Sequence, residues 1–482
     1  MKGKILVPIG LLLLCCGVYV WLRVMVRNAD VPSEPIPFHP DDVETPTDVL
    51  SSFRLLRLGY EQEAALGLEY LNDNWEPGFV AMLSESFRRP ISPAKRELVT
   101  ALLNERTRQN FSLETPDEQF EVMKWVWKRP YQPPKDYAAF KGSLYSEWDP
   151  KFAAYFAEPL KASIRLDEIM WGGVTQDFIP VLDNPTVIAA DDASYLDDGD
   201  AVFGVEIDGA ARAYPKRILG HHEMVRDIVG KTSINGVFCT LCNTMVVYNT
   251  KVEDQHYQLG TSGFLYRSNK LMFDRKTNSL WSTIEGKPVV GPLTDSGLQL
   301  ERLPVVTTTW QQWRKLHPQT DVLSLETGYR RDYREGAAYK EYYATDRLMF
   351  PVQAQDKRLA NKTSVLALRF ANDERLAITA DFLSKNPVFH SQLADQKFVV
   401  ITDASGASRV YEEGGVRFEK IRGITVVDSS GQEWTMTESA LEQGDQKLLR
   451  LPAHRAFWFA WYSAFPATKL VGDVDEGGRS DR

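Results

Sequence analysis

The chain has 482 residues, of which 43% are hydrophobic and 25% charged, and its formal net charge is −9. This length favours two or three domains over one core, and the composition is that of a globular protein. The acidic balance and the lack of a lysine or arginine block argue against non-specific nucleic-acid binding, which needs a basic face.

The first element along the chain is an uncharged apolar run over residues 5–22. A membrane-spanning helix needs roughly 17–25 apolar residues, and the small-residue cleavage site of a signal peptide is missing. A cleaved signal peptide is the first rival interpretation, and Cys15 and Cys16 make a lipoprotein signal the second, but each cysteine follows a larger residue than such signals use. We therefore expect an uncut membrane anchor over residues 1–27.

The positive charges on either side of the apolar run indicate the orientation of this anchor. Lys2, Lys4 and the amino terminus precede the run, and Arg23 and Arg27 follow it. The positive-inside rule then slightly favours a cytoplasmic N-terminus and an exported body. The expected location is the inner membrane of a bacterium, with the soluble region on the periplasmic side and the membrane as its partner.

The next two segments are a linker and a helical module. Residues 28–50 are rich in Pro, Asp and Thr, which predicts an extended linker. Over residues 51–160, apolar side chains recur on one helical face and prolines interrupt the pattern at short intervals. We expect five or six short helices there, with a packing role.

After residue 160 the pattern changes to short runs rich in Val, Ile, Phe and Tyr, such as "AVFGVEI" and "TMVVYN", with turn residues between them. Such runs predict strands. The expected fold class is α+β: the anchor, the helical module, then a first β-rich unit over residues 161–350 and a second, degenerate unit over residues 351–472. The tail, residues 473–482, is expected to be disordered.

The two β-rich units resemble each other. "AVFGVEIDGAARAYPKRIL" from Ala201 aligns with "SVLALRFANDERLAITADFL" from Ser364, and three further segments match in the same order. The last match keeps two tryptophans and a proline at identical spacing, Trp310, Trp313 and Pro318 against Trp458, Trp461 and Pro466. Self-similarity in one order predicts an internal duplication of a small sheet closed by an aromatic helix.

Cys239 and Cys242 are the only cysteines outside the apolar run. Their C-x-x-C spacing suits a disulfide, a redox couple or half of a metal site, because thiolates bind soft ions such as Zn²⁺ and Cu⁺. The duplication places Thr402 and Ser405 at the same turn of the second unit. Since that unit makes the turn without thiols, a purely structural role is less favoured.

Several kinds of site are excluded or weakened. A zinc ribbon needs a second cysteine pair, and a c-type haem needs His where the chain has Asn243. The residues after Cys242 predict a strand, so the thiols lie on a turn between strands and not at a helix start as in thioredoxin. A hydrolase is disfavoured because the G-x-S-x-G, H-E-x-x-H and P-loop motifs are missing.

Long segments, among them "WGGVTQDFIPVLDNP", "HHEMVRDIVG", "CTLCNTMVVY" and "GTSGFLYRSNKLMFDRKTNSLWS", resemble an uncharacterised family, the domain of unknown function 3179. The similar segments cover most of residues 165–472. The resemblance implies a cysteine pair at Cys239 and Cys242 and a His-Glu pair at His222 and Glu223. The sequence departs from the family pattern at three residues: Thr240 where the family often has Pro, His221 where it often has Trp, and Phe178 where it tends to have Gly.

We predict a thiol-based site in a cleft of the first unit, with partial solvent access. In one version Cys239, Cys242 and His222 bind a metal, copper or zinc, and leave one position open. In the other the thiols form a redox couple, with His222 or Glu223 as proton acceptor and both thiols catalytic. The alternative function is a ligand-binding or scaffold module with structural cysteines. Possible polar contacts for a ligand are Arg267, Asn269 and residues 330–334.

Overall fold

The computed structural model describes residues 43–88, 90–370 and 374–472 and divides the chain into two compact units. The first unit contains Leu83–Leu113 and the chain up to Phe79, and the second contains Val80–Met82 and the chain from Glu114 onward. The predicted anchor, most of the linker and the tail lie outside the described residues. Among the described helices, none is both long and apolar enough to cross a membrane.

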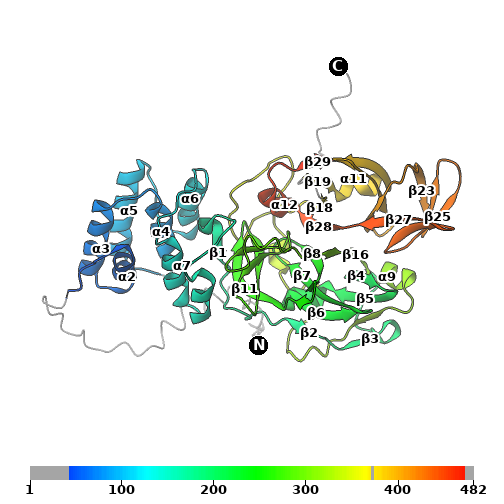
Figure 1. Cartoon of the computed structure of the whole chain (residues 1–482), viewed down its shortest axis with the longest axis horizontal. Helices are drawn as coiled ribbons and strands as arrows, with labels where there is room; N and C mark the ends of the chain where they lie inside the picture. The colour runs from blue at the N-terminus through cyan, green and yellow to red at the C-terminus, as the bar shows by residue number, and fades with distance from the viewer. Residues whose placement is uncertain (1–42, 89, 371–373, 473–482) are drawn as a thin grey trace, which may run out of the picture. The chain divides into compact units, whose positions relative to one another are not determined.

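The first unit is helical (Figure 1). It contains α2 (Val49–Leu58), α3 (Glu61–Asp73) and α5 (Pro93–Thr107), while α4 (Phe79–Ser86) contributes residues to both units. Side-chain caps define where these helices begin: Asp48 accepts a hydrogen bond from the main chain of Ser51, and Ser92 precedes a proline at the first position of α5. Phe53, Leu56 and Leu71 are among the fully buried side chains of this unit.

The helices α6 (Pro116–Trp127) and α7 (Tyr137–Ser146) belong to the second unit. The sequence analysis expected one helical module over residues 51–160, but in the structure the residues from Glu114 onward group with the β-rich strands. The reason is aromatic packing on β11 (Leu259–Tyr266): the ring of Phe264 lies 5.1 Å from that of Tyr145 and 4.7 Å from that of Phe152. The indole of Trp127 also donates to the carbonyl of Asp167 at 3.0 Å.

The first half of the β-rich body contains three sheets and a short two-stranded ribbon. The first sheet has the order β16 (Val306–Thr309), β4 (Ala201–Ile207), β5 (Ala210–Pro215), β17 (Asp321–Leu323), β3 (Val187–Ala189). The second has the order β15 (Arg302–Leu303), β8 (Thr244–Asn249), β7 (Thr232–Cys239), β6 (Met224–Val229), β2 (Leu182–Asp183). The third has the order β1 (Ile169–Trp171), β11, β12 (Asn269–Asp274), β13 (Leu280–Ser282), β14 (Pro288–Val290). The ribbon pairs β9 (Lys251–Val252) with β10 (Gln255–His256).

The second half of the β-rich body contains two sheets, of which the first repeats the strand order of a sheet in the first half and the second is one continuous eight-stranded sheet. One sheet runs β28 (Ala453–Phe457), β18 (Ser364–Arg369), β19 (Arg375–Thr379), β29 (Lys469–Val471). The other runs β20 (Val388–Leu393), β21 (Gln396–Thr402), β22 (Ser408–Glu412), β27 (Gln446–Leu451), β26 (Ala440–Gln443), β25 (Glu433–Met436), β24 (Thr425–Asp428), β23 (Phe418–Arg422). In chain order, β18, β19, β28 and β29 take the places of β4, β5, β16 and β17, and both β5–β17 and β19–β29 pair in parallel.

Short helices occupy matching places in the two halves. After β5 and β19 come α8 (Lys216–His222) and α11 (Ala380–Lys385), and after β16 and β28 come α9 (Trp310–Leu316) and α12 (Trp458–Ala464). The second tryptophan of each aromatic helix donates to a threonine hydroxyl at 2.9 Å, Trp313 to Thr320 and Trp461 to Thr468.

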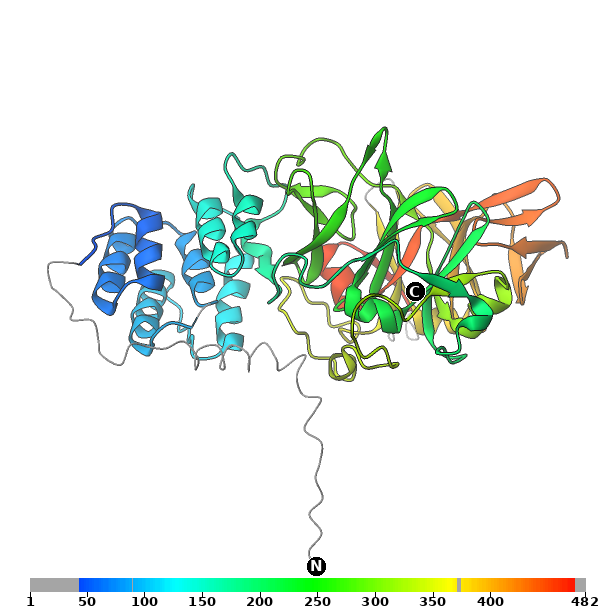
Figure 2. The ribbon, with the colours of Figure 1, turned by 90° about the horizontal axis from the view of Figure 1, so that it is seen from below.

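The two halves exchange contacts through these elements. The main-chain N–H of Phe457, just before α12, donates to the carbonyl of Cys242 at 2.8 Å. In return, Ala407 of the second half packs with Trp310 and Trp313 of α9. Figure 2 shows α12, in red, against the green strands of the first half. The turn that carries the thiols is therefore covered by the start of a helix from the second half.

Candidate functional site

Cys239 ends β7 and Cys242 lies in the turn before β8, as the sequence predicted. The two sulfurs are 2.7 Å apart, and both cysteines are free thiols. The turn closes through a main-chain hydrogen bond from Cys242 to the carbonyl of Cys239, 3.2 Å long. A bond between the sulfurs needs a separation of about 2.05 Å, so a small movement within the turn would join them.

The two thiols have different hydrogen-bond partners. The Cys242 thiol lies 3.1 Å from the side-chain oxygen of Asn269 and 3.4 Å from the carbonyl of Ser268. Both partners are acceptors, so they favour a proton on the Cys242 sulfur. The Cys239 sulfur instead lies 2.7 Å from the Cys242 sulfur and receives a hydrogen bond from the main chain of Lys270.

This difference separates the acidities of the two thiols. Burial raises the pKa of Cys239, but the contact with the Cys242 sulfur, the hydrogen bond from the main chain of Lys270 and the positive charge of Lys270 outweigh it and hold the pKa below its ordinary value. Burial and the neighbouring Cys239 raise the pKa of Cys242 well above its ordinary value. One thiol of the pair is therefore the more easily ionised.

A buried ion pair lies beside the thiols. The carboxylate of Glu223 pairs with the ammonium of Lys270, and the two residues are only 4% and 8% exposed. The other carboxylate oxygen accepts hydrogen bonds from the hydroxyls of Thr240 at 2.7 Å and Tyr339 at 3.0 Å. The predicted proton acceptor Glu223 therefore lies in the site, where its carboxylate is already paired with Lys270.

Three tyrosines from one short segment cover the turn. They lie on α10 (Lys340–Tyr343) and on the residue before it. Tyr342 donates to the carbonyl of Leu241 at 3.0 Å, and Tyr343 donates to the carbonyl of Thr240 at 2.7 Å. With Tyr339 on Glu223, all three hydroxyls contact the thiol turn or its carboxylate neighbour. We call Tyr339, Tyr342 and Tyr343 the tyrosine cover.

The prediction of partial solvent access is wrong for this conformation, because Cys239 is 3% exposed and Cys242 is fully buried. Leu241, Leu265, Val352 and Phe459 pack around them together with the tyrosine cover. The site is not purely apolar, however, since Lys270, Glu223 and Asn269 face the same turn. It is a covered site with charged groups inside it.

His222 does not join the thiols, which corrects the predicted ligand set of Cys239, Cys242 and His222. Its Nδ1 lies 2.9 Å from the carbonyl of Pro180, and its Nε2 lies 2.5 Å from the hydroxyl of Tyr333. Both ring nitrogens are therefore used elsewhere. Across the residues that the structure describes, no group of three or more His, Cys, Asp or Glu side chains is arranged to hold a metal ion.

The backbone explains why His222 and Glu223 separate. The helix α8 ends at His222, and the next residue, Glu223, caps it with a φ of 57°, which lies in the left-handed region. This reversal directs the side chain of Glu223 toward Thr240, while the ring of His222 remains against Tyr329 and Tyr333. Asn243, Arg267 and Ser268 also have positive φ values, and unfavourable backbone conformations of this kind cluster at functional sites.

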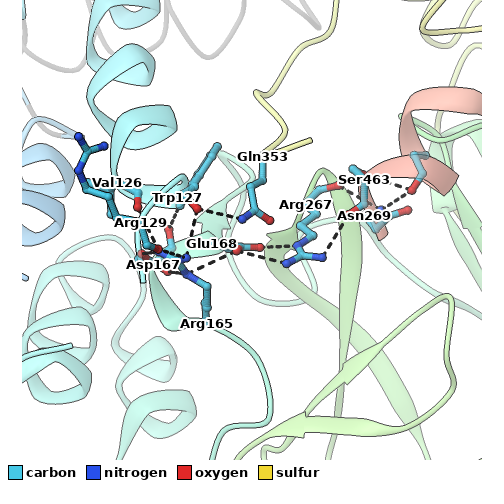
Figure 3. A network of polar contacts seen from close by, with 11 residues as sticks. Val126, Trp127, Arg129, Arg165, Asp167, Glu168, Arg267, Asn269, Gln353 and Ser463 are labelled. Atoms are coloured by element: carbon cyan, nitrogen blue, oxygen red, sulfur yellow. Dashed lines mark hydrogen bonds and ion pairs between the residues drawn. The ribbon is translucent and has the colours of Figure 1, made fainter. Parts of the chain in front are cut away.

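Of the predicted ligand contacts, Asn269 reaches Cys242, whereas Arg267 is bound to Glu168 and Ser463. Figure 3 shows the polar network around the turn between β11 and β12, in which Arg267 pairs with Glu168 and donates to the carbonyl of Ser463 at 3.3 Å. Asn269 donates to the carbonyls of Arg267 and Ala460, each at 3.1 Å. The network therefore anchors the partner of Cys242.

The arginines of the "GYRRDYR" segment do not reach the thiols. Arg330, Arg331 and Arg334 are exposed, and Arg334 pairs with Asp332. Their segment instead contributes Tyr333, which contacts His222.

The sequence reasoning missed Lys270 and the tyrosine cover. Lys270 directly precedes the apolar residues of "SNKLMF", and a charged residue next to such a run is the signal that could have identified it. The tyrosines form a visible cluster in "YKEYY". They lie far from the thiols in the sequence: their two hydrogen bonds to the turn join residues 101 and 103 positions apart. The sequence therefore gave no sign of this contact.

Comparisons with known proteins add one finding to this geometry. Residues 176–468 match a family described as a protein of unknown function (DUF3179), and this span includes both thiols, Glu223, Lys270 and the tyrosine cover. Comparisons with curated proteins and with solved structures found no match. Because the match extends over most of the chain, the chain belongs to the DUF3179 family of proteins of unknown function.

Proposed function

We propose that Cys239 and Cys242 form a dithiol–disulfide redox couple. The observation that carries this proposal is the asymmetric, charged surrounding of two sulfurs only 2.7 Å apart. Burying an ion pair is costly, and replacing such a pair by apolar residues is often neutral or stabilising. Perturbed titratable groups in a buried cluster are also typical of functional sites. A charged pair beside the thiols is therefore better explained by chemistry than by stability.

The proposed reaction is thiol–disulfide exchange with a disulfide of another molecule. One cysteine thiolate attacks a substrate sulfur, the substrate S–S bond breaks, and the first substrate thiolate leaves and takes up a proton. The second cysteine then loses its proton and attacks the mixed disulfide, which releases the second substrate thiolate. The protein gains one S–S bond and gives up two electrons and two protons, and the substrate is reduced to two thiols.

Access to the buried thiols requires movement of the tyrosine cover in this proposal. The cover belongs to a short helix held by hydroxyl contacts to the turn. Such local opening costs less than global unfolding when few contacts are broken.

The alternative function, a binding or scaffold module with structural cysteines, is favoured by one observation, the complete burial of Cys242. A disulfide across so short a loop would stabilise the fold little, because its stabilisation grows with loop length. This alternative predicts thiols that react only when the chain unfolds.

A redox titration distinguishes the two functions. The full-length chain with Cys15→Ser and Cys16→Ser is equilibrated with mixtures of reduced and oxidised glutathione and quenched with acid. The remaining thiols are then alkylated and counted by intact mass spectrometry. The redox couple predicts one midpoint at which two alkylation sites disappear together, with no such transition in Cys239→Ser or Cys242→Ser. Thiols that stay reduced across the whole series in the folded protein would support the structural role and overturn the proposal.

The architecture and location form a second part of the proposal. Residues 201–323 and 364–471 are two copies of one unit, supported by the matching order of β16, β4, β5, β17 and of β28, β18, β19, β29, and by the equivalent bonds of Tyr248 and Tyr411, each donating to a threonine carbonyl at 2.6 Å. In the second copy the equivalent turn carries the buried pair Asp403–Arg409 in place of thiols. The run over residues 5–22 anchors the chain in a membrane, with the body outside the cytoplasm.

A further inference from the structure

We infer that Cys239 is the attacking thiol of the pair, that Cys242 is the resolving thiol, and that Lys270 stabilises the Cys239 thiolate. The inference rests on the proposed thiol–disulfide exchange and assigns a role to a residue that no sequence motif singled out. It follows from the positions of donors and acceptors around the two sulfurs.

Cys239 is surrounded by groups that stabilise a negative charge. Its sulfur lies 2.7 Å from that of Cys242 and receives a hydrogen bond from the main chain of Lys270, and the Lys270 ammonium adds a positive charge in the same buried space. Charge-assisted hydrogen bonds are stronger than neutral ones, especially where water is excluded. Cys242 is instead surrounded by acceptors, the side chain of Asn269 and the carbonyl of Ser268. Those acceptors stabilise the protonated thiol, so Cys242 keeps its proton while Cys239 attacks.

Lys270 is held in position for this role. It lies on β12, where it pairs with Leu265 of β11, and its side chain is 8% exposed. Its ammonium is also bound by Glu223, whose own position is fixed by Thr240 and Tyr339. In the disulfide form the charge of the Cys239 thiolate is gone, yet Lys270 keeps Glu223 as its counter-ion. The site therefore tolerates both redox states without leaving a buried lysine unpaired.

The titratable groups that face Cys239 come from several elements. Besides Cys242 and the Lys270–Glu223 pair, they are Tyr342 and Tyr343 of the tyrosine cover. Burial raises the pKa of both tyrosines, so they stay neutral while the thiol titrates. Among these groups, Lys270 is the only cation, and its removal is the change that acts most directly on the Cys239 thiolate.

Single-cysteine variants test the order of the thiols. In the full-length chain with Cys15→Ser and Cys16→Ser, Cys242→Ser leaves Cys239, and Cys239→Ser leaves Cys242. A small aromatic disulfide that releases a coloured thiolate serves as the substrate. Cys239 should react at least about tenfold faster than Cys242 at neutral pH, because an opposite charge within reach shifts a thiol pKa by about 1–3 units. Equal rates, or a faster Cys242, would overturn the assignment. These variants cannot form the intramolecular disulfide, so their result does not depend on the redox titration.

Lys270 is then tested in the Cys242→Ser background. Lys270→Met should slow the reaction at least about tenfold and move the midpoint of its pH profile upward by about one unit or more, and Lys270→Arg should restore most of both. Lys276→Met, which removes an exposed lysine from the same region, is the control and should change neither. Circular dichroism checks folding, and the double variant Lys270→Met with Glu223→Gln avoids an unpaired buried carboxylate. An unchanged pH midpoint in the folded double variant would remove Lys270 from the assignment.

Discussion

The hydroxyl of Tyr343 donates a hydrogen bond to the main-chain carbonyl of Thr240, between the two cysteines, at 2.7 Å. Tyr342 makes the equivalent contact with Leu241 at 3.0 Å. Both carbonyls that lie between the thiols are therefore held by phenols of one short helix. A change in the turn and a change in the cover are mechanically linked through these two bonds.

The first prediction concerns this link. Tyr342→Phe with Tyr343→Phe keeps both rings but removes both hydroxyl bonds, which contribute about 0.5–1.5 kcal/mol each. Opening of the cover should become easier, and alkylation of the reduced thiols by iodoacetamide should accelerate about 5- to 150-fold. Intact mass against time measures the rate. Tyr257→Phe, in which a ring packed on Trp281 is retained, is the control and should react as the parent does. An unchanged rate in the double variant would mean that the thiols are reached by another route.

The second prediction tests the equivalence of the two halves. Thr320→Val and Thr468→Val each remove the acceptor of a buried indole N–H, on Trp313 and Trp461 respectively. Leaving a buried donor unsatisfied costs about 1–3 kcal/mol, so the two variants should lose similar unfolding free energies in urea. Thr307→Val, a partly exposed strand position, should stay within about 0.5 kcal/mol of the parent. A large loss in one variant and none in the other would show that the aromatic helices are not equivalent.

Local patterns in the sequence accounted for much of the fold. The turn between the strands that carry the thiols follows from "VFCTLCNTMVVY", where β-branched and aromatic residues flank a short polar break. The repeated spacing of Trp310 and Trp313 with Trp458 and Trp461 identified two similar helices, because side chains three apart share one helix face. These features depend on near neighbours, and a sequence displays near neighbours directly.

The composition of the site depended on contacts between distant segments, which one sequence does not display. Lys270 reaches Glu223 across 47 positions, and Tyr343 reaches Thr240 across 103. The misassignment of His222 had a local cause. A left-handed residue at Glu223 turns two adjacent side chains in different directions, and no glycine or asparagine marked that conformation in advance. The extent of the helical module was missed because aromatic packing on β11 determines it, not the helical pattern itself.

The third prediction concerns the membrane anchor. An alkaline phosphatase reporter, active only outside the cytoplasm, fused after Leu50 should be active in bacteria, because the uncharged run over residues 5–22 is long enough to span a bilayer. A reporter that works only in the cytoplasm should be silent at the same position. N-terminal sequencing of the purified chain should find Met1 or Lys2, as expected for an uncut anchor. The opposite pattern of reporter activity would reverse the orientation.

The last prediction concerns the pH dependence of stability. Burial lowers the pKa of His222 to about 4, with a further contribution from the positive charges of His221 and Arg331, although the hydrogen bond to Pro180 acts in the other direction. The unfolded chain has the ordinary value, 6.5, so between these two values it binds a proton that the native protein rejects. Unfolding free energy therefore falls as the pH drops from about 6.5 toward 4.

His222→Gln removes this titration and keeps an N–H that donates to the carbonyl of Pro180. Its unfolding free energy in urea should decline less than that of the parent between about pH 7 and about pH 5, because only the parent must reject a proton at this position. The exposed His256 gives the control, since His256→Gln should decline in parallel with the parent. Other acidic groups titrate equally in all three proteins, so the difference between their slopes isolates residue 222. Parallel slopes for His222→Gln and the parent would mean that the ring is protonated as readily in the native protein as in the unfolded chain, and that its contacts with Pro180 and Tyr333 do not exclude the charge.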